Sequence, residues 1–197
     1  MLGYDLNGNV TSRTDVVHAA TTTLTWDGAN RLLSASNPSV TPTTVSYGYD
    51  LRGLRTSRTA GTNSTGYLYD TAGGVPRTVA DFSASGSGAN LTWTLNQHYD
   101  WAAGNLFAQK PLASAVLGLH PDYLGSVSFA MSGPLNSWQS RTYDAWGGQT
   151  QVGGADNHPP SPFGFTGESQ EDPASAAFGL VYLRGRCDAR ITKTARD

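Results

Sequence analysis

The stretch Tyr49-Asp50-Leu51-Arg52-Gly53-Leu54-Arg55 decides the fold. An aspartate at the first position of a turn accepts a backbone N–H two residues on, and a later glycine or asparagine adopts the left-handed conformation. Residues 50–53 therefore predict a four-residue hairpin turn, and Tyr49 ends the strand that enters it. In residues 45–49 apolar and small side chains alternate, which is typical of a strand.

The same pattern occurs seven times along the chain, usually with an aromatic residue before the aspartate. The predicted turn pairs are Asp5 and Gly8, Asp27 and Asn30, Asp50 and Gly53, Asp70 and Gly73, Asp100 and Gly104, Asp122 and Gly125, and Asp144 and Gly147. Successive aspartates are 22, 23, 20, 30, 22 and 22 residues apart. The one long step contains a Ser- and Gly-rich stretch at about 83–90, which predicts a flexible insertion between strands. A regular period of this kind indicates a repeat fold.

The length of the repeat fixes what each unit holds. About 22 residues are enough for two strands of about six residues and two turns, which is one hairpin. Because a lone hairpin is marginal in water, the units are expected to pair side by side in a continuous sheet. We therefore predict an all-β fold of consecutive hairpins with little helix. A β-propeller is disfavoured, since its blades repeat every 40 to 45 residues or so.

Composition excludes several classes of protein. Hydrophobic residues make up 38% of the 197 residues and charged residues only 14%, with a net charge of -2. Aromatic residues reach 10%, so the polar composition indicates turn-rich β-structure rather than disorder. No basic run suits nucleic acid. No window approaches the ~18 apolar residues of a membrane span, and no signal peptide is visible, as though the chain were cut from something longer.

The repeats and several segments of the C-terminal half resemble a known family. The tyrosine–aspartate (YD) repeats look like those of rearrangement-hotspot (Rhs) and related wall-associated proteins, and the C-terminal half resembles the Rhs repeat-associated core. The segments similar to that core are residues 119–127 (LHPDYLGSV), 143–147 (YDAWG), 163–168 (FGFTGE) and 179–186 (GLVYLRGR). The resemblance implies YD-repeat hairpins over residues 1–107, a core-like segment over 108–188 and a degenerate tail over 189–197.

The resemblance also implies a function. Such ribbons spiral into a hollow shell that encloses a toxin or effector, so the expected role is that of a structural, non-enzymatic fragment of an Rhs-type shell without a cofactor. The implied partners are the further YD-repeat shell of a longer parent protein and an encapsulated toxin. The implied location is secreted or at the cell surface, as part of a secretion-system effector. A fragment of this kind should expose open sheet edges and self-associate.

A residual aspartyl autoprotease is one alternative. In the family, aspartates near the end of the core can cleave the chain and free the toxin. Asp188 matches the first of them, but the proline after it is missing and no second Asp-Pro follows. Aspartyl chemistry needs two carboxylates that share a proton, so the expectation is a degenerate tail.

Other site chemistries are weighed against structural roles. Five Trp and nine Tyr allow a carbohydrate-binding surface, although a stacked hairpin ladder also buries aromatics. The repeated aspartates suit turn capping better than calcium, because each turn supplies one carboxylate. The four histidines lack metal-ligand spacing, and Cys187, the one cysteine, is expected to be a partly buried strand residue.

Overall fold

The fold is an all-β ribbon, as the repeat predicts. The computed structural model describes residues 1–15, 20–86, 90–133, 138–145, 147, 149–155, 161–170, 180–182 and 187–189. Fourteen strands form one sheet in which each strand lies beside its neighbours in sequence, and every pairing is antiparallel. Three short strands form a second sheet.

The strands of the large sheet are short and evenly spaced. They are β1 (Leu2–Tyr4), β2 (Val10–Asp15), β3 (Ala20–Trp26), β4 (Leu32–Ser36), β5 (Thr44–Tyr49), β6 (Arg55–Ala60), β7 (Asn63–Asp70), β8 (Arg77–Ser85), β9 (Thr92–Ala102), β10 (Asn105–Pro111), β11 (Leu117–Pro121), β12 (Val127–Ser132), β13 (Trp138–Tyr143) and β14 (Gln149–Ala155). The small sheet holds β15 (Ser169–Gln170), β16 (Leu180–Tyr182) and β17 (Cys187–Ala189). A 3-10 turn, η2 (Phe165–Gly167), precedes β15.

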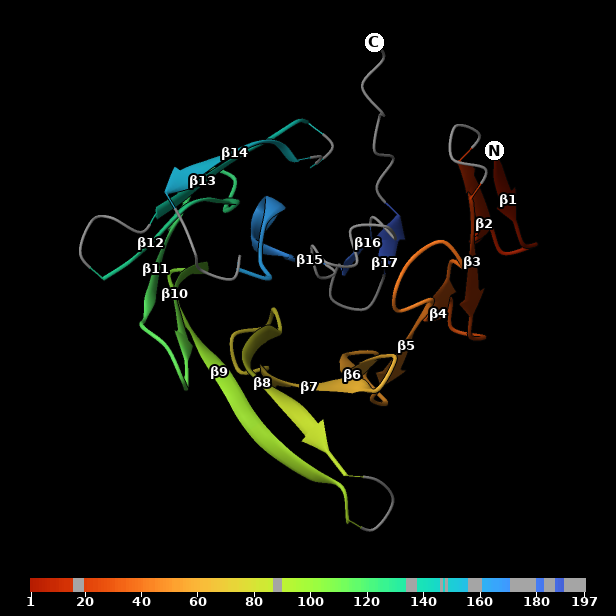
Figure 1. Cartoon of the computed structure of the whole chain (residues 1–197), viewed down its shortest axis with the longest axis horizontal. Coiled ribbons are helices and arrows are strands. Elements are labelled where there is room, and N and C mark those ends of the chain that lie inside the picture. The colour runs from red at the N-terminus through yellow and green to blue at the C-terminus, as the bar shows by residue number, and fades with distance from the viewer. Residues whose placement is uncertain are drawn as a thin grey trace.

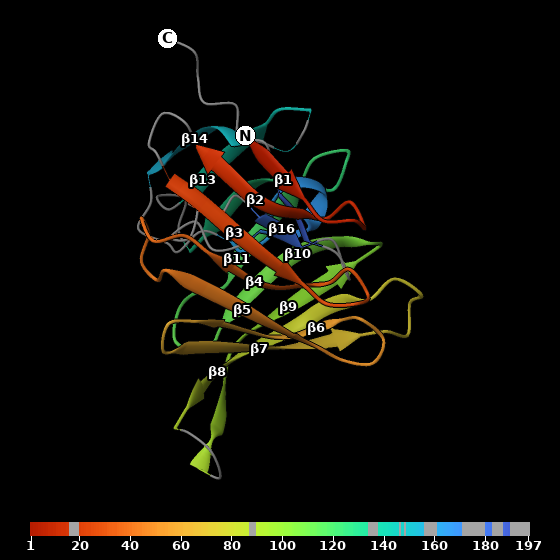
Figure 2. The ribbon, with the colours of Figure 1, turned by 90° about the vertical axis from the view of Figure 1, so that its right-hand side faces the viewer.

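The large sheet curls into an open ring, and the segment that carries β15 to β17 lies inside it (Figure 1). Strands β1 and β14 form the two open edges. Viewed from the side, the strands run obliquely across the wall, and the β8–β9 hairpin projects below it (Figure 2). The sheet therefore has a concave face, which faces the strands β15 to β17, and a convex face outside.

The apolar core lies on the concave face in two clusters. The first contains Leu24, Leu32, Ala35, Val45 and Tyr47. The second contains Tyr99, Leu106, Leu117, Leu119, Val127, Ala130 and also Phe163 from the inner segment. At most repeats the register shifts beside the residue that precedes the aspartate, as at Gly48/Tyr49 and Thr142/Tyr143. Such bulges increase the local twist, which helps the ribbon to curl.

The convex face of β2 to β7 carries small hydroxyl side chains. Pairs of hydroxyls bond across neighbouring strands, namely Thr14 with Thr21, Thr25 with Ser34, Ser36 with Thr44, and Thr59 with Ser64. Cross-strand pairs of this kind stabilise a sheet without a second layer. The alternation of apolar and polar residues in the sequence thus separates core from surface.

The strands can be compared with two predictions about organisation, the boundary at residue 107 and the insertion at about 83–90. The sheet runs through the expected boundary at residue 107, because β10 spans residues 105–111, so the division into repeats and core stays a prediction. The insertion expected at about 83–90 is in part regular strand, since β8 continues to Ser85 and β9 begins at Thr92. Residues 83–85 pair with 92–94 there, which extends the hairpin instead of forming a loop.

Candidate functional site

Four of the seven turns share one hydrogen-bond pattern. In the turn of Asp50, the Oδ1 atom accepts the N–H groups of Arg52 at 2.9 Å and Leu54 at 2.8 Å. The carbonyl of Asp50 accepts the N–H of Gly53, whose φ is +85°. The turns of Asp5, Asp27 and Asp122 repeat this pattern, with Gly8, Asn30 and Gly125 in the left-handed conformation. The carboxylate thus accepts hydrogen bonds from backbone N–H groups that would otherwise have no partner in the sharp turn.

The turn of Asp144 follows the pattern as far as the structure describes it. The Asp144 carbonyl accepts the N–H of Gly147 at 3.0 Å, and Gly147 has a φ of +79°. A Cβ at Gly147 would lie only 2.5 Å from the Phe165 ring, so glycine is also required for space. Trp146 and Gly148 lie outside the described residues.

Two predicted turns differ from the sequence expectation. Asp70 does cap its turn, accepting the N–H of Ala72, but Gly74 rather than Gly73 has the positive φ. The reason is a longer connection, in which six residues (71–76) separate the strands and move the left-handed position by one.

Asp100 is not a turn residue at all, and that prediction is wrong. It lies inside β9, opposite Ala108, and forms an ion pair with Lys110. The tight turn lies farther on, where Ala103 and Gly104 have φ values of +47° and +91°. Two left-handed residues in succession make a two-residue hairpin connection, which needs no aspartate cap.

A second repeated contact was missed by the sequence reading. In five repeats the aromatic side chain donates a hydrogen bond to a backbone carbonyl at the start of the strand after the preceding turn; we call this the repeat-linking hydrogen bond. The pairs are Trp26 to Val10 (2.8 Å), Tyr49 to Leu32 (2.8 Å), Tyr69 to Arg55 (2.9 Å), Trp101 to Thr78 (2.8 Å) and Tyr143 to Val127 (2.9 Å). Trp101, not Tyr99, makes this bond in the fifth repeat, where the pattern is displaced by two residues.

The repeat-linking bond has a direct test. Replacing Tyr69 by phenylalanine removes the hydroxyl and little else, so we expect the free energy of unfolding to fall by about 1 kcal/mol. Chemical denaturation of both proteins measures the difference. Tyr4, which makes no hydrogen bond of this kind among the described residues, provides the control: Tyr4→Phe should leave stability unchanged. Equal losses in the two variants would contradict a linking role.

Arginines that follow the turns lie over aromatic rings. Arg31 lies 5.1 Å from the centre of the Tyr49 ring and donates to the Asp50 carbonyl at 3.1 Å. Arg55 is 1% exposed and lies between the rings of Tyr47 and Tyr67, at 5.6 and 4.8 Å. A guanidinium between two aromatic faces is held by cation–π attraction, which strengthens as water is excluded. Arg31 thus links the turn of Asp27 to the turn of Asp50.

A polar network lies on the concave face between the two core clusters. The Tyr99 hydroxyl donates to Asp81 at 2.5 Å, and Gln97 donates to the same carboxylate at 2.7 Å. Gln109 donates to Gln97 at 2.7 Å, and Asn96 donates to Asp81 at 3.1 Å. Burial first, and then the charge of Asp81, raises the pKa of Tyr99 well above its usual range. The Oε1 atom of Gln109 is buried without a hydrogen-bond partner among the described residues.

Three groups with shifted pKa values, Asp5, Asp27 and Tyr99, predict how stability depends on pH. The side chain of Asn9 lowers the pKa of Asp5; at Asp27 desolvation acts to raise the pKa, but hydrogen bonds from Arg31 and Ala29 outweigh it and lower it. A carboxyl with a lowered folded-state pKa stabilises above its unfolded value near 4 and loses that contribution as pH falls through the folded value. Tyr99 has the opposite sign, because its raised pKa stabilises the fold below about pH 10. Melting temperature should therefore decrease below about pH 4 and above about pH 10; a flat profile to pH 2 would contradict the carboxylate argument.

The inner segment, residues 161–169, lies against the concave face of the later repeats. Its backbone binds the sheet: Val127 donates to the Gly164 carbonyl at 2.9 Å, and Ser126 accepts the Thr166 N–H at 3.0 Å. Arg141, buried on the same face, donates to the carbonyls of Ser161 and Phe163, both at 3.2 Å. Sequence segments 119–127, 143–147 and 163–168, which carry the family resemblance, thus meet at one place.

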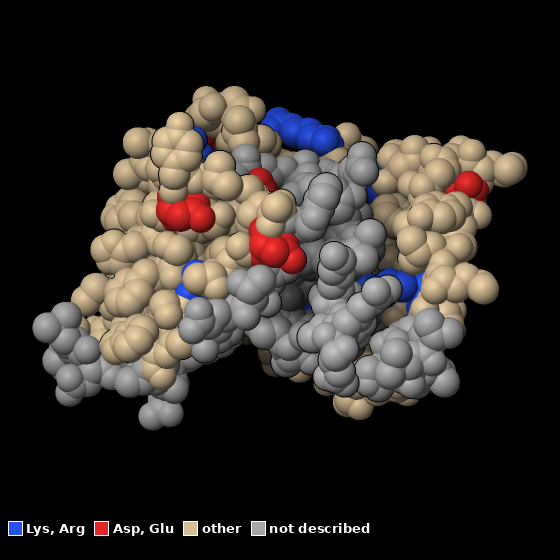
Figure 3. All heavy atoms as spheres, turned by 90° about the horizontal axis from the view of Figure 1, so that it is seen from above, with Lys and Arg blue, Asp and Glu red and all other residues tan. Residues whose placement is uncertain are grey.

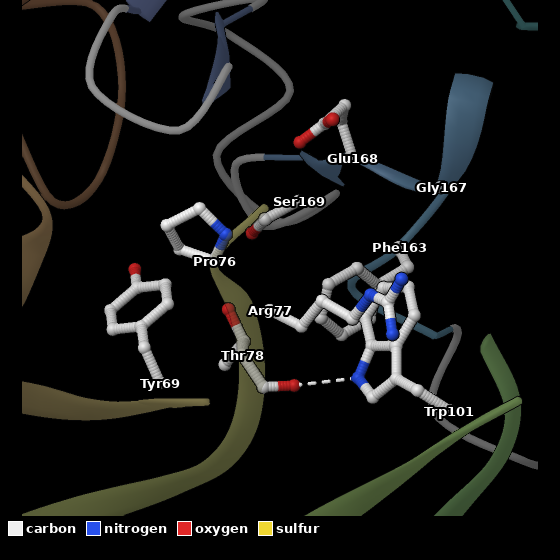
Figure 4. A pocket seen from close by; sticks show the side chains of 9 residues that line it. All are labelled: Tyr69, Pro76, Arg77, Thr78, Trp101, Phe163, Gly167, Glu168 and Ser169. Atoms are coloured by element: carbon white, nitrogen blue, oxygen red, sulfur yellow. Dashed lines mark hydrogen bonds between the residues drawn. The ribbon is translucent and has the colours of Figure 1, made fainter. Parts of the chain in front are cut away.

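Phe163 anchors this segment between two aromatic rings. Its ring meets Tyr99 edge-to-face at 4.8 Å and Trp101 at 5.7 Å. Figure 4 shows Arg77 beside Trp101 and Phe163, with Glu168 and Ser169 above them and the bond from Trp101 to Thr78 dashed. The cavity enclosed there measures only about 10 Å³, which is room for about one water molecule. This junction is therefore a packed contact and not a ligand pocket.

Comparisons with known proteins agree with this geometry. The family described as RHS Repeat matches residues 4–39. The chain contains an Rhs repeat. No curated protein shows significant sequence similarity to this chain.

Solved structures show a similar fold. The crystal structure of TcdB2-TccC3-Cdc42 matches with a TM-score of 0.59 and 13% identity over 94% of this chain, and that of TcdB2-TccC3-TEV with 0.55 and 13% over 85%. A structure of the Photorhabdus luminescens Tc holotoxin pore matches with a TM-score of 0.59 and 14% identity over 94%. The chain covers only 8 or 9% of the length of these solved chains.

The remaining candidate residues lie at separate places in the chain or outside the described side chains. Asp188 and Cys187 lie on β17, opposite Val181 and Tyr182, and their side chains are outside the description. His98 and His120 lie on different strands, and His18 and His158 fall outside the described residues. Within the described part of the chain, no three His, Cys, Asp or Glu side chains gather as metal ligands do.

Charge and hydropathy agree with the composition. Seen from above, the acidic and basic side chains among the described residues are few and scattered (Figure 3). No helix among the described residues is long and apolar enough to cross a membrane.

Proposed function

We propose that the chain is a structural, non-enzymatic part of the wall of an Rhs-type shell, with its concave face toward the interior. The observation that carries this proposal is the binding of the inner segment to the concave face. Residues 161–169 are held on the concave face by backbone hydrogen bonds and by Phe163, so this face accepts a polypeptide segment. A wall that encloses an unfolded cargo needs a face with these properties.

The geometry of the ribbon supports the same role. Repeat-linking bonds join neighbouring repeats at five places, and Arg31 joins the turn of Asp27 to that of Asp50, which supports a continuous curved sheet. Both edges, β1 and β14, are open. The solved chains that share the fold are more than ten times longer, as the coverage of 8 or 9% requires. The chain therefore corresponds in size to one arc of a larger wall.

The cargo and the location follow from the same proposal. The family resemblance implies a toxin or effector inside the shell, further YD-repeat shell as partner, and secretion or display at the cell surface. Neighbours that include a Tc holotoxin pore support this assignment by fold. A toxin polypeptide is the cargo proposed for the concave face, because that face binds backbone carbonyls and an aromatic side chain of residues 161–169.

The wall role is tested by the oligomeric state. Light scattering coupled to size-exclusion chromatography should show association that grows with protein concentration, because open sheet edges pair with one another. Electron microscopy of the associated fraction should then show curved ribbons. A monomer at every concentration, melting in one sharp transition, would overturn the proposal.

A carbohydrate-binding surface is a second candidate, favoured by one observation. On the convex face Phe129 and Trp138 lie nearly parallel, with ring centres 5.8 Å apart, and Trp138 is 37% exposed. Exposed aromatic faces can stack on sugar rings. Titration of tryptophan fluorescence with cell-wall fragments tests this, with Trp138→Ala as the control. If no fragment changes the fluorescence, or if Trp138→Ala responds as the parent protein does, the candidate is excluded.

A further inference from the structure

An open hollow lies where the strands β7 and β9 end and the strands β8 and β10 begin. Its volume is about 340 Å³, which is within the range of sites that bind small molecules. The residues that line it are Asp70, Arg77, Val79, Tyr99, Asp100, Trp101 and Phe107. The lining therefore combines apolar surface with charged groups of both signs.

Two β-bulges supply apolar side chains to this hollow. The pairing of β7 with β8 skips Val79, and the pairing of β9 with β10 skips Phe107, whose ring is 45% exposed. The residues skipped in the same way in four other repeats are Thr11, Leu33, Thr56 and Ser128. A bulge leaves its extra residue outside the pairing and redirects the side chain, and bulges are frequent beside functional sites. Two neighbouring repeats thus direct an apolar side chain into one hollow.

The two carboxylates of the hollow make fewer contacts than a carboxylate in a regular turn. Asp70 accepts one backbone N–H, that of Ala72, whereas Asp50 accepts two. Asp100 lies in a strand and forms a partly exposed ion pair with Lys110. Within the described part of the chain, the second oxygen of each carboxylate has no partner. Both oxygens are therefore available to a cation in the hollow.

Arg77 supplies the positive charge of the lining. Its guanidinium carbon lies 5.8 Å from the centre of the Trp101 ring, and Figure 4 shows the two side chains next to each other. Asp70 stands opposite Arg77 in the pairing of β7 with β8, yet the two side chains form no ion pair. Cation–π attraction holds the guanidinium on the ring, and its N–H groups remain available to an anionic group of a ligand.

These charges select one class of ligand. A simple anion would meet two carboxylates, and a simple cation would leave Arg77 without a counter-ion, so a molecule with both charges fits best. We propose that the hollow binds a small zwitterion whose cationic end is an alkylated ammonium, as in phosphocholine. Asp70 and Asp100 attract the ammonium, its methyl groups pack on Phe107 by cation–π attraction, and Arg77 donates to the anionic end. This binding does not depend on the wall role.

Phosphocholine is the probe, and isothermal titration of the full chain should show saturable binding. Choline, which lacks the anionic end, should bind about fivefold more weakly. The neutral alcohol 3,3-dimethylbutan-1-ol has carbon in place of the ammonium nitrogen of choline and should bind at least about tenfold more weakly than phosphocholine. Co-sedimentation with phosphatidylcholine vesicles would assign the ligand to lipid headgroups, whereas binding of free phosphocholine alone would assign it to soluble compounds.

Three variants test the residues of the hollow. Phe107→Ala should weaken phosphocholine binding about fivefold through the lost cation–π contact. Asp70→Asn keeps an Oδ1 acceptor for Ala72 but removes the charge, and should weaken binding about threefold. Lys110→Gln frees Asp100 from its ion pair and should strengthen binding about twofold. A purely structural role of Asp100 predicts no such gain.

The matched control is Leu33→Ala, which removes the corresponding bulge residue of another repeat and should bind phosphocholine as the parent chain does. Thermal unfolding of each variant verifies that it is folded. The site would be overturned by an absence of saturable phosphocholine binding, by equal affinity for the neutral alcohol, or by equal losses in Leu33→Ala and Phe107→Ala. If Phe107→Ala proves unstable, Asp70→Asn and Lys110→Gln still decide, because they must change affinity in opposite directions.

Discussion

Replacing Phe163 by alanine is expected to lower the free energy of unfolding of the inner contact by about 3 to 5 kcal/mol, the usual cost of removing a buried phenylalanine. The ring is 4% exposed and fills the space between Tyr99 and Trp101. Alanine would remove both ring contacts, so the loss should fall within this range.

The loss has a specific signature in hydrogen exchange. The N–H groups of Val127 and Thr166 bond across the junction, so their exchange should accelerate in Phe163→Ala. The turns at Asp5 and Asp27, far along the ribbon, should keep their protection. Phe107→Ala is the matched control, because that ring is 45% exposed and should cost little. If both variants lose the same stability, Phe163 does not anchor the segment.

Much of the ribbon could be predicted because its information is local. An aspartate followed by glycine or asparagine bends the chain by contacts within five residues, and the period of about 22 residues then requires paired hairpins. The prediction held where the spacing was regular. It was wrong at Asp100, where two successive left-handed residues make their own turn two positions later.

The signal for that displacement was present in the sequence. Trp101 follows Asp100 directly and precedes Ala102, Ala103 and Gly104, so an aromatic residue stands closer to the turn than Tyr99 does. If the aromatic had been expected to donate a hydrogen bond to the preceding repeat, Trp101 would have been identified as the donor. That role is visible only when neighbouring repeats are placed side by side.

The inner contact could not be predicted in the same way. Ser126 and Thr166 are 40 residues apart, and they meet because the ribbon curls. Curvature is a sum of small twists over many strands, and no short motif encodes it. The family resemblance named both segments, but neither residue pattern indicated that one would pack against the other.

The second large effect separates two aspartates that look alike in sequence. Asp50→Ala should lower the free energy of unfolding by about 2 to 3 kcal/mol, because the carboxylate accepts two backbone N–H groups and such charge-assisted bonds are strong. Asp100→Ala should cost less than about 0.5 kcal/mol, since its ion pair with Lys110 is partly exposed. Denaturation of the two variants under the same conditions measures both.

An amide distinguishes the hydrogen bonds of the turn from its charge. Asp50→Asn keeps an Oδ1 acceptor for Arg52 and Leu54, so it should recover roughly half of the loss seen in Asp50→Ala, because neutral acceptors are about half as strong. If Asp50→Asn is as unstable as Asp50→Ala, the carboxylate acts through charge and not through the turn geometry. If Asp100→Ala matches Asp50→Ala, position in the repeat and not the observed hydrogen bonds decides the energy, and the turn mechanism is wrong.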